Sequence, residues 1–255
     1  MGTMSQDPAT AISAIAGFSE PFSSLSHLLA AGVFLALGIV LLSRSRASAA
    51  GTLALLVYVA GVTFALSMSG VFHLLLPGSA AKAVFQRLDH AGIFFLIAAT
   101  YTPIHMIVFR GFMRWGILST VWIVAITGIT LKTIFFNDIA EWLGLSLYLS
   151  LGWFGVFSTF RLYKRFGLQY IKPILYGALA YTVGALLEFL RTPILIPQVI
   201  GPHELFHVLV LVGISMHWLF NYRVARNPTS QPEMTKLDMF NTPLEEEPAS
   251  VDISV

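Results

Sequence analysis

The sequence predicts an all-α membrane protein, a seven-transmembrane helix bundle with an intramembrane metal site. Composition supports the membrane assignment, because 56% of the 255 residues are hydrophobic and only 11% are charged. Soluble domains lie nearer half apolar and a quarter charged. The metal site is predicted from a few histidine, serine and aspartate residues inside apolar segments. Burying such side chains without partners is costly, so inside a membrane segment they indicate a functional site.

Seven apolar segments are long enough to cross a bilayer, which takes about 20 residues in a helix. The segments are continuous and lack two-residue alternation, which argues against strands. In order, they are 23–43, 52–76, 87–109, 112–131, 141–161, 171–190 and 203–222. The connections between them contain the expected polar residues, glycines and prolines, in order Ser43-Arg44-Ser45-Arg46, Pro77-Gly78-Ser79, Arg110-Gly111, Asn137-Asp138, 161–172 and 193–202. Pro202 suits the first turn of the last helix, where its missing N–H is not needed.

The predicted domain organisation is a short N-terminal segment, 1–22, a seven-transmembrane domain, 23–225, and a C-terminal tail, 226–255. The tail contains four prolines and the run Glu245-Glu246-Glu247. Because such a segment buries little apolar surface, we expect it to be flexible. The net charge of +2 is too small to argue for a nucleic-acid partner.

The basic residues predict an orientation in the cell membrane. Eleven of them fall on loops one, three and five or in the C-terminal region, namely Arg44, Arg46, Arg110, Arg114, Arg161, Lys164, Arg165, Lys172, Arg223, Arg226 and Lys236. The remaining four lie on the other side, namely Lys82, Arg87, Lys132 and Arg191. Because Lys and Arg favour the cytoplasmic side, the count predicts the N-terminus outside and the C-terminus in the cytoplasm.

The candidate metal ligands are His73, His203 and His207. His73 lies near the end of the second segment, and the other two open the seventh, so an alternating bundle brings them to one depth. The sequence has no cysteine, so any metal must be held by His, Asp or Glu. Three histidines can bind zinc and leave one coordination position open.

Ser69 and Asp89 are the candidate catalytic residues beside this metal. Residues four apart share one helix face, which puts Ser69 beside His73. Asp89 opens the third segment at the same depth. A hydroxyl and a carboxylate are the groups expected to orient the imidazoles or a bound water.

Other polar residues have simpler interpretations. Lone membrane histidines such as His105 and His217 are often interhelical hydrogen-bond donors. Glu188 is expected to pair with Arg191 three residues later. His203-Glu204-x-x-His207 also matches the HExxH pattern of zinc proteases, which leaves an intramembrane metalloprotease as an alternative.

Several motifs together resemble the haemolysin III branch of the progestin and adipoQ receptor family, which is related to alkaline ceramidases. They cover the chain from Glu20 to about Tyr222. The matching motifs are Glu20-x-x-Ser23-x-x-Ser26-His27, Gln86-Arg87-Leu88-Asp89-His90-Ala91-Gly92-Ile93, Ala99-Thr100-Tyr101-Thr102-Pro103 and Pro202-His203-Glu204-Leu205-Phe206-His207. An asparagine is usual in the family where Ser23 stands.

The resemblance implies a zinc ion held by His73, His203 and His207, with a water bridging to Asp89 and Ser69 in support. It also implies a membrane lipid as substrate or ligand. The first hypothesis is therefore zinc-dependent hydrolysis of an amide bond in a lipid such as ceramide. The alternatives are a receptor or membrane-stress sensor with structural zinc, and a haemolytic protein. No polar stripe follows several helices, which argues against a pore, and whether the chain forms a homo-oligomer stays open.

Overall fold

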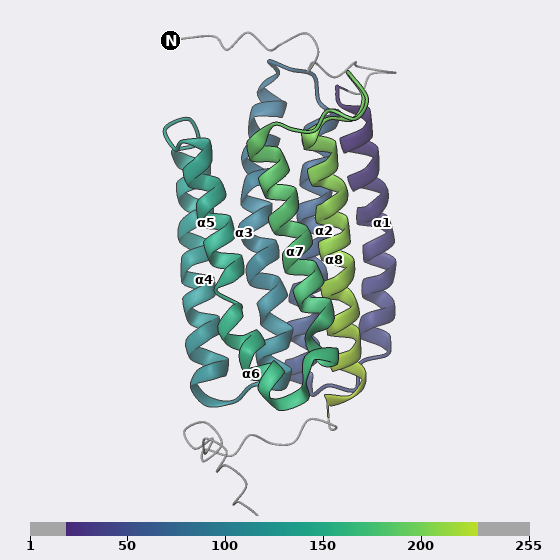
Figure 1. The fold of residues 1–255 in the computed structure, drawn as a ribbon, viewed down its shortest axis with the longest axis vertical. Helices are drawn as coiled ribbons and strands as arrows, with labels where there is room; N and C mark the ends of the chain where they lie inside the picture. Colours follow the sequence, from purple (N-terminus) through teal and green to yellow (C-terminus); the bar gives the residue numbers. More distant parts are fainter. Residues whose placement is uncertain (1–18, 229–255) are drawn as a thin grey trace, which may run out of the picture.

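The computed structural model describes residues 19–228, so residues 1–18 and 229–255 of the predicted terminal segments lie outside the described part. Within 19–228 the chain forms a bundle of helices that run up and down side by side (Figure 1). The helices are α1 Pro21–Ser43, α2 Ala49–Leu74, α3 Ala80–Val108, α4 Gly111–Ile134, α5 Glu141–Trp153, α6 Val156–Phe166, α7 Leu168–Leu190 and α8 Pro202–Arg226.

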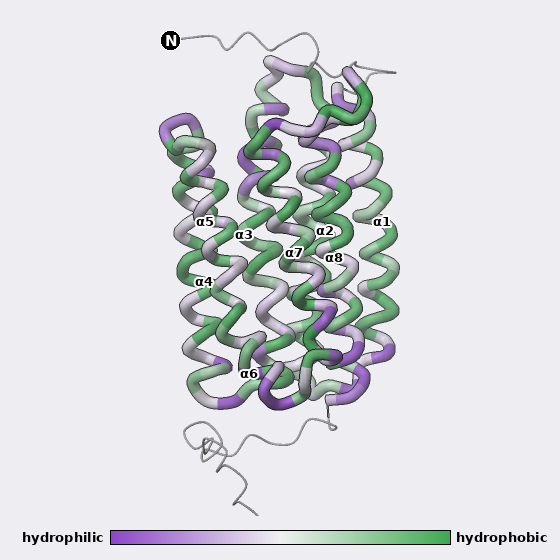
Figure 2. The backbone as a smooth tube through the Cα atoms, in the orientation of Figure 1, coloured by the Kyte–Doolittle hydropathy of each residue, from purple (hydrophilic) through white to green (hydrophobic). Residues whose placement is uncertain are grey.

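The predicted seven-span architecture is confirmed. Among the described residues, seven helical spans are long and apolar enough to cross a membrane, with α5 and α6 together making the fifth. Figure 2 shows hydrophobic residues along the middle of the bundle and hydrophilic residues gathered towards its two ends. Hydrophobic side chains outside the core also stay exposed, for example Leu29, Ile39 and Phe112. This distribution suits a bundle whose outer surface contacts lipid.

The fifth span differs from the single helix predicted at 141–161, because it breaks after Trp153. Tyr101 of α3 donates from its hydroxyl to the carbonyl oxygens of Leu151 and Gly152, both at 2.9 Å. The N–H of Gly155 turns back to the Gly152 carbonyl at 3.2 Å instead of continuing the α-helical pattern. A side chain that inserts into the ladder of backbone hydrogen bonds is a known cause of a helix kink.

Helix α3 begins seven residues earlier than the predicted start at residue 87. Ser79 caps it, accepting the backbone N–H of Lys82 at 3.1 Å. The first turns contain the polar residues Lys82 and Gln86, so hydropathy alone excluded them from the span. Asp89 therefore lies in the third turn of α3 and does not open the helix. Figure 1 shows α3 rising past the start of α8. Asp89 lines one cavity with His203 and His207, which places it near that start.

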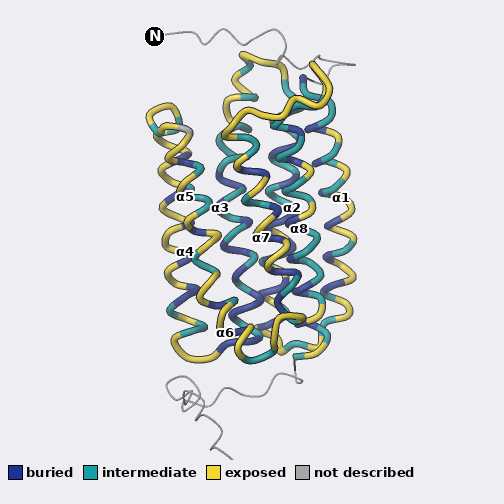
Figure 3. The backbone as a smooth tube through the Cα atoms, viewed as in Figure 1, coloured by how far each residue is buried: buried dark blue, intermediate teal, exposed yellow. Residues whose placement is uncertain are grey.

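Helices α2, α3 and α8 form the centre of the bundle. Figure 3 shows the buried positions gathered along these helices, while α1 and α4 expose one side. Helix α8 packs against α1, α2, α3 and α7. Leu66 of α2, Leu96 of α3 and Ile214 of α8 belong to one buried cluster. This cluster packs α2, α3 and α8 together, and α2 and α8 contain the candidate metal ligands.

Candidate metal centre

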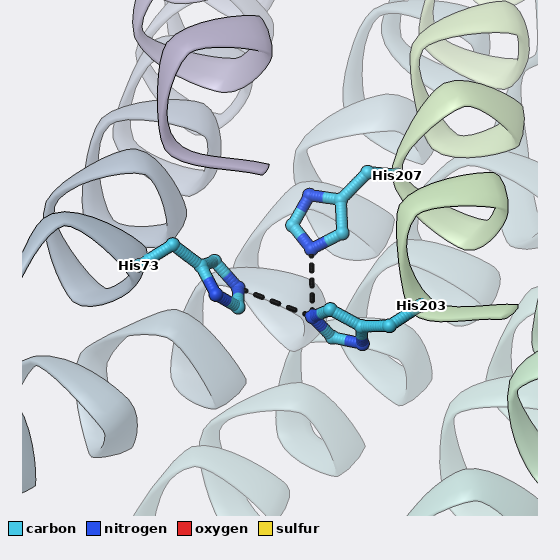
Figure 4. A group of neighbouring side chains, drawn as sticks. All are labelled: His73, His203 and His207. Carbon is cyan, nitrogen blue, oxygen red and sulfur yellow. Dashed lines mark hydrogen bonds between the residues drawn. The ribbon is translucent and has the colours of Figure 1, made fainter. Parts of the chain in front are cut away.

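The three candidate ligands come from two helix ends that meet at one end of the bundle. His73 lies in the last turn of α2, and His203 and His207 lie in the first two turns of α8. Pro202 is the first residue of α8, as predicted. Figure 4 shows the three imidazole rings turned towards one another across the gap between α2 and α8.

The Nε2 atoms of the triad converge. His203 Nε2 lies 3.3 Å from His73 Nε2 and 3.0 Å from His207 Nε2. One nitrogen atom from each residue lies within 4.8 Å of the other two, an arrangement that could hold a metal ion. The structure thus brings the three side chains together, while metal binding by them stays a prediction.

Two of the three nitrogen–nitrogen distances, and the donor set, are compatible with a tetrahedral zinc ion. With Zn–N bonds of 2.0–2.1 Å, neighbouring ligand nitrogens in a tetrahedron lie about 3.3–3.4 Å apart. The two Nε2 separations from His203 are close to that value. His73 and His207 are buried at 2% exposure each, so their facing nitrogens have little access to bulk water. A cation shared between the lone pairs satisfies all three nitrogens at once.

Each ligand histidine also has a partner at its Nδ1 atom. His73 Nδ1 lies 2.5 Å from Glu20 Oε2. His203 Nδ1 lies 3.4 Å from Glu188 Oε1, and His207 Nδ1 lies 2.8 Å from His27 Nε2. Metal-binding histidines commonly donate this second N–H to a carboxylate or another acceptor, which fixes the tautomer. All three histidines can thus present Nε2 to one ion.

Glu20 stands just before the first span and contacts Lys82 as well as His73. Burial raises its pKa, but hydrogen bonds and positive charge from His73 and Lys82 outweigh that effect and lower the pKa to about 2. Lys82 Nζ donates to Glu20 Oε1 at 3.0 Å. An ionised carboxylate can only accept hydrogen bonds. Glu20 therefore accepts the N–H of His73 Nδ1, which leaves the Nε2 atom of a neutral His73 as the one that can bind an ion.

A cavity of about 60 Å³ lies beside the triad. It is lined by residues of α1, α2, α3 and α8, namely His27, Ala65, Leu66, Ser69, Asp89, Ile93, Leu96, His203, Phe206, His207, Val210 and Ile214. The candidate catalytic residues Ser69 and Asp89 thus share the cavity with two of the candidate ligands. The volume suits a few water molecules, each of which occupies about 30 Å³ in the liquid.

The outer partners were only partly predicted. The pairing of Glu188 with Arg191 is present, with the guanidinium donating to Oε1 at 2.8 Å. The contact of Glu188 with His203 was not anticipated, and no role was assigned to Glu20 or His27. The spacing of Glu20 and His27 was a usable signal, because residues seven apart lie on one helix face.

Glu204 of the HExxH pattern forms hydrogen bonds with the start of α8 and with α1. Its Oε2 accepts the backbone N–H of Gly201 at 3.0 Å, and its Oε1 accepts the hydroxyl of Ser23 at 3.1 Å. The side chain is 1% exposed and is not part of the cavity lining. Glu204 thus helps to begin α8, the helix that supplies two of the candidate ligands.

The remaining histidines of the spans lie outside the triad. His105 links helices as predicted, because Nδ1 donates to the Met113 carbonyl of α4 and Nε2 meets Ser158 Oγ of α6 at 3.1 Å. His217 is buried and stacks on Tyr181, with ring centroids 5.7 Å apart. His90 donates from Nδ1 to the Gln86 carbonyl within its own helix at 2.9 Å.

The fold and the triad define a class of protein: an integral membrane protein with seven helical spans and a buried histidine cluster at one end. Comparison with known families identifies the particular group. Residues 17–218 match the family described as haemolysin-III related, and the chain belongs to this family, the haemolysin III branch of the progestin and adipoQ receptors.

Two curated relatives come from bacilli. The chain is 32% identical over 135 residues to Hemolysin-3 of Bacillus cereus, covering 53% of this chain and 58% of the relative. It is 29% identical over 132 residues to the Hemolysin-3 homolog of Bacillus subtilis (strain 168), covering 52% of this chain and 59% of the relative. These matches span less than two thirds of either relative.

Proposed function

We propose that this protein is a zinc-dependent hydrolase that cleaves an amide bond of a membrane lipid such as ceramide. The observation that carries the proposal is the convergence of three Nε2 atoms beside a cavity lined by Asp89 and Ser69. The relation of the family to alkaline ceramidases points to the lipid amide. The apolar surroundings of the cavity suit a substrate that arrives from the bilayer.

The proposed ligands are His73, His203 and His207, each binding through Nε2. Three protein ligands leave a fourth position for water or substrate, as in catalytic zinc sites. A bound zinc ion would supply Lewis-acid chemistry and lower the pKa of a coordinated water towards about 7. The buried setting of His73 and His207 keeps bulk water away from these nitrogens.

Asp89 is the proposed general base and acid. Its carboxylate lies at the cavity, where it would accept the proton of the attacking water as the new C–O bond forms. It would then return that proton to the amide nitrogen as the C–N bond breaks, releasing a fatty acid and an amine. Positioned proton transfer of this kind contributes about 10²–10⁴-fold to the rate. The Ser69 hydroxyl would hold the water or the substrate carbonyl by a hydrogen bond.

The experiment compares ceramide turnover by the purified wild type with three variants. His73→Ala should abolish turnover and zinc binding together. Asp89→Asn should lower kcat by about 10²–10⁴-fold while zinc stays bound. His217→Ala is the matched control, because it removes another buried histidine of α8 that lies outside the triad. Wild-type turnover in His73→Ala would overturn the proposal.

A second candidate function is a receptor or membrane-stress sensor in which the zinc is structural. The size of the cavity favours it, because about 60 Å³ is far below the about 300–1,000 Å³ of typical ligand pockets. Hydrolysis therefore requires side chains or helices around the cavity to move apart. If the zinc is structural, Asp89→Asn leaves output unchanged, and truncation after Asn227 abolishes partner binding.

An intramembrane metalloprotease is less well supported. That chemistry requires the glutamate of HExxH to act on water at the metal. Both carboxylate oxygens of Glu204 are already hydrogen-bonded, to Ser23 and to the backbone of Gly201. Glu204→Gln would keep most of these contacts, so it should leave lipid hydrolysis largely intact, whereas a protease would lose its activity.

A further inference from the structure

The start of α1 contacts both helices that contain the candidate metal ligands. Glu20, Ser23 and His27 are spaced by three and then four residues, so they lie on one face of the helix. Glu20 contacts His73 of α2, and His27 contacts His207 of α8. None of these contacts involves a neighbour in sequence.

Ser23 adds an indirect contact between the start of α1 and the start of α8. Its hydroxyl donates to Glu204, whose other oxygen accepts the backbone N–H of Gly201 at the start of α8. This chain of hydrogen bonds fixes the first turn of α8, which contains His203. The beginning of α1 thus reaches two of the candidate ligands directly and the third through the backbone.

Burial makes these contacts structurally demanding. Ser23 is fully buried and His27 is 4% exposed. A buried polar group left without a partner is destabilising, so each pairing strongly favours one side-chain position. The imidazole of His27 also packs against that of His207, with ring centroids 4.0 Å apart. The rotation of the His207 ring is therefore limited by both contact and hydrogen bonding.

We propose that the first two turns of α1 are a positioning element for the metal centre, in which Glu20 and His27 orient the imidazoles of His73 and His207. The proposal rests on metal binding by the triad, which is part of the proposed function, and does not depend on lipid hydrolysis. Glu20 and His27 do not bind the ion. They accept the Nδ1 protons of the two ligands and so keep both Nε2 atoms directed at one point.

His27 has a defined chemical role in this arrangement. When His207 Nε2 binds an ion, its Nδ1 bears the proton and must donate it to an acceptor. The nearest nitrogen of His27, at 2.8 Å, can accept only if it is unprotonated. An amide oxygen can take the same role, so glutamine should replace His27 in part, whereas alanine cannot.

The test measures Zn²⁺ affinity of the full-length protein in detergent by competition with a chelator, together with the visible spectrum of the Co²⁺-loaded form. Loss of an outer partner of a metal ligand typically weakens metal affinity about 10–100-fold. We expect that loss in His27→Ala and in Glu20→Ala, with altered Co²⁺ bands. His27→Gln and Glu20→Gln should recover part of the affinity.

Ser24→Ala is the matched control. Ser24 stands beside Ser23, is fully buried, and donates to the Gly70 carbonyl of α2 at 2.8 Å, but it contacts none of the ligands. It should lower thermal stability like the other variants and leave Zn²⁺ affinity and Co²⁺ bands at wild-type values.

Three outcomes would overturn the inference. Unchanged Zn²⁺ affinity in both alanine variants would show that α1 does not position the ligands. An equal loss of affinity in Ser24→Ala would show that its role is general packing. Wild-type protein that binds no Zn²⁺ would instead remove the metal centre itself, and the proposed function with it. If the alanine variants fail to fold, the Zn²⁺ affinities of His27→Gln and Glu20→Gln decide. Both are expected to be lower than the affinity of Ser24→Ala.

Discussion

The two ends of the bundle use buried histidines in different ways. At the end where α8 begins, His203 Nε2 faces the Nε2 atoms of His73 and His207 at 3.3 and 3.0 Å. Towards the other end, both nitrogens of His105 meet hydrogen-bonding groups, the Met113 carbonyl and Ser158 Oγ. A histidine that meets a carbonyl and a hydroxyl is satisfied within the protein. Three histidines that face one another form a group that could hold a metal ion.

His217 differs from both the triad and His105. It is buried on α8 and stacked on Tyr181, and its Nδ1 has no hydrogen-bond partner among the described residues. No second imidazole or carboxylate joins it in a ligand-like group within that part of the chain. Burial and residue type therefore do not define a metal ligand. Convergence with other donors does.

The largest expected difference between the two ends of the bundle is the side of the membrane that each one faces. The charge count predicts that the end with the metal centre faces outward, so Asn137→Cys should react with a membrane-impermeant maleimide in intact cells. Gln169→Cys at the opposite end should stay protected until the cells are opened. The chain contains no cysteine, so each variant has a single reactive thiol. The reverse labelling pattern would contradict the predicted orientation.

Removal of the metal should destabilise the protein strongly. Ligand present at about 1,000 times its dissociation constant stabilises a folded protein by about 4 kcal/mol. A chelator should therefore lower the thermal midpoint of the wild type, and added Zn²⁺ should restore it. His105→Ala should show the same zinc-dependent shift. A substitution of His73, His203 or His207 that kept the zinc-dependent shift of the thermal midpoint would contradict the distinction between the two ends of the bundle.

His105→Ala should lower stability without changing zinc binding. It removes two interhelical contacts and leaves a buried hydroxyl and carbonyl without their partner. The expected cost is about 1–3 kcal/mol, measured by thermal or denaturant unfolding in detergent. Zinc content of the folded fraction serves as the second measurement. Loss of zinc from His105→Ala would show that the two ends are coupled.

The smallest effect is expected at Arg191, which bonds the outer partner Glu188 from an exposed position. Its side chain is 60% exposed in this pair, and exposed ion pairs contribute about 1 kcal/mol or less. Arg191→Ala should therefore change the thermal midpoint little. Zn²⁺ affinity should change less than in Glu188→Gln, which alters the group beside His203 itself. The reverse order would mean that Arg191 controls the site.

The sequence was sufficient to predict the spans and the triad, for physical reasons. A span needs a long apolar run, and hydropathy detects such runs directly. His203 and His207 are four residues apart at the start of a span, so one helix face had to contain both. His73 could be placed at the same depth because neighbouring spans alternate in direction.

Other features depend on contacts between distant residues. Tyr101 breaks the fifth span from another helix, and no local pattern in 141–161 revealed this. The polar first turns of α3 hid its start, which moved Asp89 from the first turn to the third. The spacing of Glu20 and His27 put both on one face of α1, but the residues that this face contacts became known only when α1 was placed against α2 and α8.

Metal analysis of purified protein tests the central claim, that the triad of His73, His203 and His207 holds one divalent ion. The comparison requires wild type, His207→Ala and the control His217→Ala, purified without chelator. A metal centre at the triad predicts close to one zinc per chain in wild type and His217→Ala, and almost none in His207→Ala. Equal zinc in all three proteins, or none in the wild type, would contradict it.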